Sequence, residues 1–117
     1  MQYQFEELKV WQKGMQLVKE IYRMTKDFPK EEQYGLTGQL RRAAVSIPAN
    51  LAEGKGRFHP REQIQFFYTA RGSAYEVMTL LQVARDLDYL KDSEAQALRI
   101  LLNEVTAMLN SLIKALQ

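Results

Sequence analysis

Five basic side chains within about twenty positions carry the most distinctive chemistry of the chain. Arginine presents a planar fork of N–H donors that matches phosphate oxygens, and it keeps its charge at any accessible pH. Two rings beside them, Phe58 and His59, are of the type that stacks on unpaired bases. The pattern predicts a surface for RNA or DNA, although solvated charge around a helix end would look the same in a sequence. The predicted nucleic-acid-binding residues are Arg41, Arg42, Lys55, Arg57 and Arg61.

A second polar set combines one arginine with side chains some twenty positions earlier. Arg71 falls within the apolar arc of a helical pattern, near Phe67 and Tyr75. Removing an unpaired guanidinium from water is costly, so Arg71 needs a partner. We expect that partner to be Glu53, with two hydrogen-bonding side chains on neighbouring turns. The sequence predicts a buried polar clamp between two helices, or alternatively a polar pocket at the bundle centre, formed by Glu53, Arg71, Ser46 and Asn50.

Patterns for catalysis and metal binding are weak. The single histidine, His59, directly precedes a proline, and no serine stands at a motif spacing from it. His59 and Glu62 offer two metal ligands at most, and the chain has no cysteine. The segment Gly54-Lys55-Gly56 is too short for a phosphate loop and ends a helix rather than opening one. We therefore expect no enzyme activity, no metal and no cofactor.

Length and composition predict one folded unit over residues 1–117. Of these residues 46% are hydrophobic, and a chain of this size buries about two-thirds of its unfolded surface without disulfides. Neither an apolar run of membrane-spanning length nor a signal-peptide start is present, so we expect a cytoplasmic protein without a membrane partner. The net charge is +2, but residues 39–72 carry six basic and two acidic side chains, a net +4. This asymmetry favours a polyanionic partner.

Apolar residues recur at three- and four-residue steps through most of the chain, which is the period of an α-helix. Pro60 suits a first helical turn, Gly54 and Gly56 suit a helix end, and Pro48 should bend the helix that contains it. No alternating strand pattern of useful length occurs. Four helices with short connections predict an all-α, antiparallel up-and-down four-helix bundle. The predicted helices span about 6–27, 36–54, 60–87 and 93–116.

The first two predicted helices have more apolar surface than one core needs. We place the stripe of Leu8, Trp11, Met15, Val18 and Tyr22 in the core, which leaves a second apolar stripe on the adjoining face. Monomers rarely expose contiguous apolar patches above roughly a few hundred Å². We therefore expect another copy of the chain to cover this surface, unless the N-terminal segment or residues 28–35 do so. The predicted oligomer interface comprises Val10, Leu17, Ile21, Met24, Val45, Ala49 and Ala52.

A helix-turn-helix over residues 36–68 is a competing interpretation of the basic segment. It needs a sharp turn near residues 54–56 and an exposed second helix. The helix after that turn soon becomes strongly apolar at Ile64, Phe66 and Phe67, which suits a core better than a DNA groove. A bundle that binds only protein partners, without contact to nucleic acid, is the other alternative.

Several motifs together resemble those of a known family. The most specific is Arg-Arg-Ala-Ala-Val-Ser-Ile-Pro-Ala-Asn-Leu-Ala-Glu-Gly at residues 41–54, preceded by Gln39-Leu40. The likeness continues through Phe28-Pro29, Tyr34-Gly35-Leu36, Gly72-Ser73-X-X-Glu76 and the opening Leu8-X-Val10-Trp11. With these motifs spread over nearly its whole length, the chain resembles the four-helix-bundle proteins encoded in intervening sequences of bacterial 23S ribosomal RNA genes.

The resemblance implies a small cytoplasmic bundle that assembles as a homopentamer, the oligomer known among members of the family. A related group accompanies the reverse transcriptases of diversity-generating retroelements, where a basic pentameric barrel binds the enzyme and nucleic acid. For most members no activity is established. The expectation is a non-enzymatic homo-oligomeric scaffold whose partners are its own copies and RNA, DNA or a nucleic-acid enzyme such as a reverse transcriptase.

Overall fold

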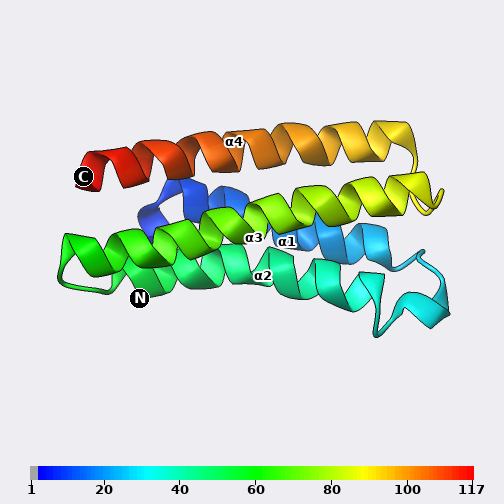
Figure 1. Ribbon diagram of the computed structural model, residues 1–117, viewed down its shortest axis with the longest axis horizontal. Coiled ribbons are helices and arrows are strands. Elements are labelled where there is room, and N and C mark those ends of the chain that lie inside the picture. The colour runs from blue at the N-terminus through cyan, green and yellow to red at the C-terminus, as the bar shows by residue number, and fades with distance from the viewer. Residues whose placement is uncertain (1–2) are drawn as a thin grey trace.

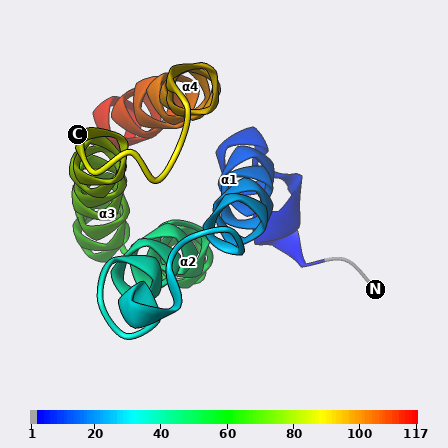
Figure 2. The same cartoon turned by 90° about the vertical axis from the view of Figure 1, so that its right-hand side faces the viewer.

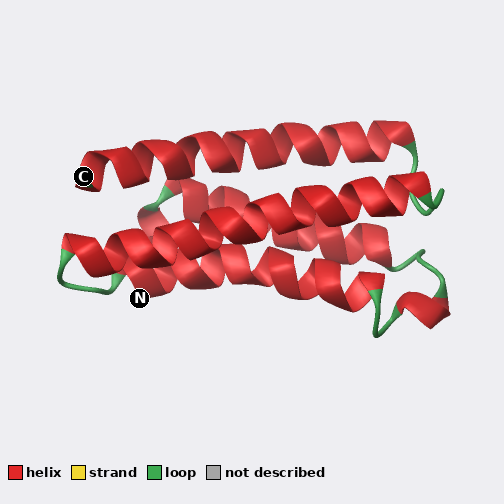
Figure 3. Ribbon diagram, in the orientation of Figure 1, coloured by secondary structure: helices red, strands yellow, loops and turns green. Residues whose placement is uncertain are grey.

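The computed structural model describes residues 3–117, which form four long helices and two short 3-10 helices without any strand (Figure 3). The short helices, η1 (Gln4–Glu7) and η2 (Lys30–Glu32), precede the first and second long helices. The predicted all-α class and the packing of the helices as a compact bundle are confirmed. The long helices are α1 (Lys9–Thr25), α2 (Leu36–Lys55), α3 (Pro60–Asp86) and α4 (Asp92–Leu116).

The four long helices lie along the longest axis of a molecule that measures 43 × 25 × 22 Å (Figure 1). The α2–α3 loop stands at one end, and the connections before α2 and before α4 stand at the other. Viewed end-on, the helices follow one another around the bundle in chain order (Figure 2). Each helix packs against the two beside it, and α4 returns to α1. Every helix therefore buries one face between two neighbours.

Helix boundaries follow local chemistry. α1 begins at Lys9 rather than near Glu6, because Leu8 has an extended backbone (φ −69°, ψ 123°) that separates α1 from η1. α3 begins at Pro60, since the missing N–H of proline has no partner to lose in a first turn. The turn after α3 contains Asp88 with φ 62°, a left-handed conformation that aspartate tolerates better than most residues other than glycine.

The core is mostly aliphatic and comes from all four long helices. Phe67 of α3 is its largest fully buried side chain. Burying a side chain of this kind stabilises the fold by about 1.5–3 kcal/mol relative to leaving it in water. Side chains with no exposed surface include Leu17, Ile21, Leu40, Ile47, Leu51, Val77, Leu102 and Leu109.

The packing of α1 reverses the predicted roles of its two apolar stripes. The stripe predicted to meet another copy contains Gly14, where α2 approaches so closely that a Cβ would lie 3.5 Å from Ile47 and 3.6 Å from Pro48. Because glycine permits this approach, the stripe faces the core of its own bundle. The prediction that it is exposed on a single copy is wrong for Met24, which is half-buried, and for three residues that are buried, namely Val10, Leu17 and Ile21.

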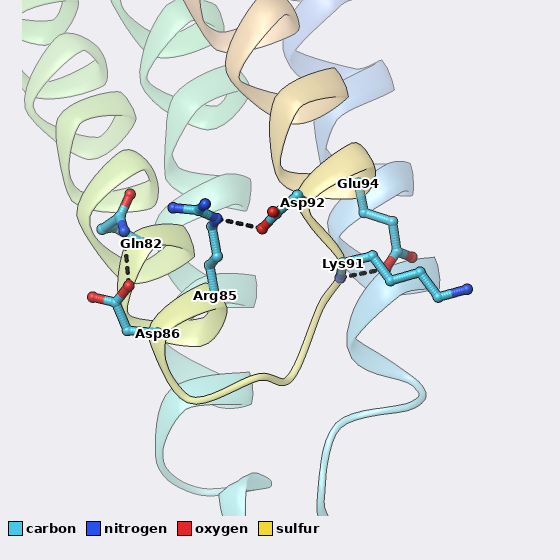
Figure 4. A network of polar contacts seen from close by, with 6 residues as sticks. All are labelled: Gln82, Arg85, Asp86, Lys91, Asp92 and Glu94. Atoms are coloured by element: carbon cyan, nitrogen blue, oxygen red, sulfur yellow. Dashed lines mark hydrogen bonds and ion pairs between the residues drawn. The ribbon is translucent and has the colours of Figure 1, made fainter.

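An ion pair and a capping hydrogen bond hold the turn between α3 and α4 (Figure 4). Arg85 Nε donates to Asp92 Oδ1 at 2.6 Å. The backbone N–H of Lys91 donates to Glu94 Oε1 at 2.9 Å, which caps the first turn of α4. The hydrogen bond from Arg85 and its positive charge lower the pKa of Asp92 below its usual value.

Replacing Asp92 with asparagine is expected to make the stability of the protein depend less on pH in the acid range. The pKa of Asp92 is lower in the folded state than its usual value of 3.8. The ion pair therefore stabilises the fold when the pH is above 3.8, and this stabilisation is lost as the pH falls below that value. We expect D92N to be less stable than the wild type at neutral pH and to lose less stability on acidification. Thermal unfolding followed by circular dichroism at about pH 7 and pH 2 measures this difference. Equal losses in the two proteins would contradict the assigned role of Asp92.

Candidate nucleic-acid interface

The α2–α3 loop brings three of the predicted basic residues together with two exposed rings. α2 ends at Lys55, the loop carries Arg57, Phe58 and His59, and the first turn of α3 contains Arg61. Phe58 is 90% exposed, and its ring meets that of His59 edge to face, with centroids 5.1 Å apart. An aromatic ring in water beside cations is the arrangement on which single-stranded nucleic acids stack. We call these five residues the α2–α3 corner.

The cations of the corner are held to different degrees. The guanidinium of Arg57 lies over the ring of Phe66, with Cζ 4.7 Å from the centroid, and its Nη2 is 3.7 Å from Glu53 Oε1. Both partners of this ion pair are exposed, so water screens it and leaves the guanidinium open to an anion. Arg61 is exposed and forms no ion pair within residues 3–117, whereas Lys55 is half-buried.

Arg41 and Arg42 do not join the corner. They lie in the first half of α2, and Arg42 is about 20 Å from Lys55 along the helix axis at 1.5 Å per residue. Arg41 is bound into the contact between α1 and α2, where its Nε donates to Thr25 Oγ1 at 2.9 Å and its Cζ lies 4.6 Å from the ring centroid of Tyr22. Arg42 is exposed. Three of the five predicted basic residues therefore lie in the corner and two lie elsewhere, and Arg41 stabilises the contact between α1 and α2.

The predicted clamp between Glu53 and Arg71 is not formed. Arg71 lies on the α4 side of α3, where its Nη1 donates to Asn110 Oδ1 at 3.0 Å and its Cζ lies 5.0 Å from the ring centroid of Tyr68. Glu53 pairs with Arg57 of the loop. The prediction is wrong because Arg71 stands at the half-buried edge of the core, where its guanidinium reaches Asn110 and the ring of Tyr68 rather than Glu53.

Ser46, another member of that set, does connect α2 to α3, through a serine that the prediction left out, and Asn50 supports it from the same helix. Ser73 Oγ donates to Ser46 Oγ at 2.8 Å. Asn50 Nδ2 donates to the carbonyl oxygen of Ser46 at 2.8 Å and to its hydroxyl oxygen at 2.9 Å. All three side chains are half-buried, and such a satisfied network fixes the packing of two helices. The motif Gly72-Ser73-X-X-Glu76 was the signal available in the sequence.

α1 and α2 share an apolar face at the outer edge of the core, against which Trp11 and Val18 still pack. Gly14 lies beside Ile47, and Tyr22 lies under Arg41, which aligns the two helices so that Val18 is level with Val45. Tyr22 and Val45 are 41% and 42% exposed, and Ala49 is also exposed. The α2 half of the predicted oligomer interface therefore lies on this face. The outer α1/α2 face comprises Trp11, Met15, Val18, Tyr22, Val45, Ala49 and Ala52.

The η1 segment covers one end of the outer α1/α2 face. The ring of Phe5 packs edge-on against Trp11, with centroids 5.3 Å apart, and Tyr3 stacks on Phe5 at 5.6 Å. Trp11 is half-buried as a result. The apolar surface that remains in water is centred on Tyr22 and Val45.

Within residues 3–117 no three His, Cys, Asp or Glu side chains lie close enough together to hold a metal ion. His59 and Glu62 are both exposed at the start of α3. None of the helices in the described part of the chain combines the length and the apolar character needed to cross a membrane.

Comparison with known proteins identifies the family. The family model described as 23S rRNA-intervening sequence protein matches residues 6–111. The chain belongs to this family. The match to the 23S rRNA-intervening sequence protein family covers all four long helices except the last residues of α4, and it confirms the resemblance seen in the motifs. No curated protein matches the chain.

A solved structure shares the fold of this 23S rRNA-intervening sequence protein. It is the crystal structure of a protein of unknown function from the S23 ribosomal protein family of Bacteroides thetaiotaomicron. The two superpose with a TM-score of 0.83 at 22% sequence identity, over 90% of this chain and 95% of the other. At this level of identity the likeness concerns the fold alone.

Proposed function

We propose that this member of the 23S rRNA-intervening sequence protein family is a non-enzymatic, homo-oligomeric scaffold that binds single-stranded RNA or DNA at the α2–α3 corner. In this proposal the chain is an antiparallel up-and-down bundle in the cytoplasm, and copies meet through the outer α1/α2 face. Five copies is the number that the family resemblance implies. A nucleic-acid enzyme such as a reverse transcriptase is a further partner that the same resemblance implies.

The exposure of Phe58 between Arg57 and Arg61 is the observation that carries the proposal. Stacking of one base on such a ring contributes about 1–3 kcal/mol, independently of the base. A single copy offers few cations, but a ring of copies multiplies the phosphate contacts and makes binding steeply dependent on salt. The opposite end of the bundle, residues 26–34 and 85–94, carries four basic and seven acidic side chains, a net −3. A polyanion is therefore attracted to the corner and repelled from that end.

Replacing Arg57 and Arg61 with glutamate is expected to weaken binding of a single-stranded 20-mer RNA by about tenfold or more. The two substitutions remove phosphate contacts and place two carboxylates beside Phe58. Fluorescence anisotropy of a labelled polyuridine 20-mer, at about 50 mM and 200 mM salt, measures the affinity and its salt slope. F58S tests stacking separately, and we expect it to lower the affinity with little change in the slope.

A matched control carries the same charge change at the opposite end of the molecule. Lys26 and Lys30 are both exposed there, and we expect K26E/K30E to bind RNA nearly as tightly as the wild type. Equal weakening by the two double variants would show that only net charge matters. If the wild type retains neither RNA nor DNA at the lower salt, nucleic-acid binding at the corner is wrong.

An oligomeric module that binds only proteins is the second candidate, and the outer α1/α2 face is the observation that favours it. Assembly would survive in this case while RNA binding would be absent, so the experiment separates the two functions. The alternative of a helix-turn-helix DNA-binding protein receives less support. α2 and α3 lie side by side along their length (Figure 1), whereas the two helices of that motif cross at about 90–120°.

A further inference from the structure

The seam between α1 and α4 contains two hollows, with the ion pair of Lys13 and Glu104 between them. The hollow near the C-terminal end of α1 has a volume of about 510 Å³ and is lined by Met24, Leu98 and Leu101. The other is a shallow depression of about 520 Å³ beside Val10 and Met108. We call this seam the α1/α4 groove; the end-on view shows the two helices that form its walls (Figure 2).

The α1/α4 groove has an apolar floor that the bundle covers in part: Leu98 and Leu101 belong to the buried core, whereas Met24 and Met108 are only half-buried. Ile100 at its edge is 52% exposed, so a large aliphatic side chain lies in water beside the half-buried Met24. Ala97, Ala107 and Ala115 of α4 also line the two hollows. Such small side chains leave room for another helix to approach closely, because side-chain size sets the distance between helix axes.

The rim of the deeper hollow is acidic. Of its charged residues, Lys13 pairs with Glu104 across the seam at 2.7 Å, and Arg23 pairs with Glu20 on α1 itself. Within each of these two pairs the positive and the negative charge cancel. The remaining charged groups of the rim are Asp27 and Glu94, and the second accepts a backbone N–H but no positive charge. This rim therefore repels a polyanion and attracts a cation, which separates it from the α2–α3 corner.

We propose that the α1/α4 groove is a docking site for a basic amphipathic helix of a partner protein. The α4 residues that line it run from Glu94 to Ala115, about 30 Å at 1.5 Å per residue, which a partner helix of about 20 residues matches. Its apolar stripe covers Ile100 and the half-buried Met24 and Met108, as in other helix-in-groove complexes. Its lysines or arginines contact Asp27 and Glu94 at one end of the groove. This charge complementarity determines the direction in which the partner helix lies. The proposal concerns a different surface from the proposed function and stands without it.

A synthetic 21-residue helix with leucines at positions i, i+3, i+4 and i+7 and lysines elsewhere is the probe. Titrating the labelled peptide with the full-length protein at about 150 mM salt, where long-range attraction is screened, we expect micromolar binding. Two further peptides control for its charge and its pattern: one has glutamates in place of the lysines, and one has the same composition in scrambled order. Both are expected to bind at least tenfold more weakly.

Two matched protein variants locate the site. D27K/I100K changes the rim and the edge of the floor, and we expect it to weaken binding of the lysine peptide at least tenfold. E76K/V83K makes the same changes of residue class and charge at exposed positions of α3, outside the groove, and should change binding less than twofold. Circular dichroism melts establish that both variants are folded. Equal weakening by both variants, or equal binding of the scrambled peptide, would overturn the proposal.

RNA binding by D27K/I100K distinguishes this proposal from the function proposed above. The α1/α4 groove and the α2–α3 corner share no residue, so we expect the variant to bind RNA at least as well as the wild type. Conversely, R57E/R61E should bind the lysine peptide with at most a twofold change. Loss of both activities in either variant would show that the two surfaces are not separate and would overturn the inference.

Discussion

Replacing Gly54 with valine is expected to destabilise the bundle by about 3 kcal/mol, at the upper end of the usual cost of overpacking. A Cβ at this position would lie 2.8 Å from both Phe66 Cβ and Phe67 Cε1. Phe66 Cβ is attached directly to the backbone of α3, and Phe67 is fully buried, so neither atom can move aside. α2 and α3 would have to separate where they now pack most closely. The free energy of unfolding, from urea denaturation followed by circular dichroism, measures the effect.

Gly72 supplies the matched control for this prediction. It lies in the middle of α3, and a Cβ there would meet nothing within 4 Å. Because glycine is a poor helix former, G72A should stabilise the protein by about 0.5–1 kcal/mol. The two substitutions both add carbon to a helical glycine, but with opposite expected signs. If G54V unfolded at the wild-type urea concentration, the close contact of α2 with α3 would be contradicted.

The role of Gly54 is an example of what the sequence does not predict. Two glycines at the end of a helical pattern predict a helix cap, and Gly56 does stand at the C-cap of α2. Gly54 lies inside the helix, and its value comes from the approach of Phe66 and Phe67. Those residues are more than ten positions away in the chain. Helical periodicity predicts that α2 exists and about where it ends, but it contains no information about which helix packs on which glycine.

The two stripes of α1 illustrate the same limit. Both are apolar and both have helical spacing, so periodicity alone cannot rank them. The deciding residue is Gly14, because α2 packs against the stripe that contains it. The surplus of apolar surface was nevertheless predicted from the sequence, and Tyr22 and Val45 show it on the structure.

Prediction of the polar site failed for a related reason. The sequence predicts a partner for Arg71 on α2, yet Arg71 donates to Asn110 of α4. A long arginine side chain at the edge of a helix face reaches either neighbouring helix, and only the packing decides which. The proximity of Arg57, Phe58 and Arg61 is predictable from the sequence, because a short loop holds them together whatever the rest of the chain does.

Replacing Val45 and Ala49 with aspartate is expected to dissociate the proposed oligomer completely. Both residues lie on the outer α1/α2 face and are exposed on a single copy, so the bundle itself should tolerate the change. In an assembly the two carboxylates would be buried against an apolar surface, which costs several kcal/mol for each unpaired ion. In a ring this cost is repeated at every contact between copies. Light scattering coupled to size exclusion should find the wild type as a multiple of 13.6 kDa and V45D/A49D at 13.6 kDa.

The control for dissociation places the same two charges one turn apart on α3. Thr79 and Val83 are exposed and lie off the outer α1/α2 face, so T79D/V83D should keep the wild-type mass. Dissociation of both double variants would mean that added negative charge, rather than this face, decides assembly. Persistence of the oligomer in V45D/A49D would place the contact elsewhere. If the wild type itself has a mass of 13.6 kDa at micromolar concentration, the proposed oligomer does not exist. Each copy would then bind RNA only through the few cations of its own α2–α3 corner, and the steep salt dependence expected of a ring would be absent.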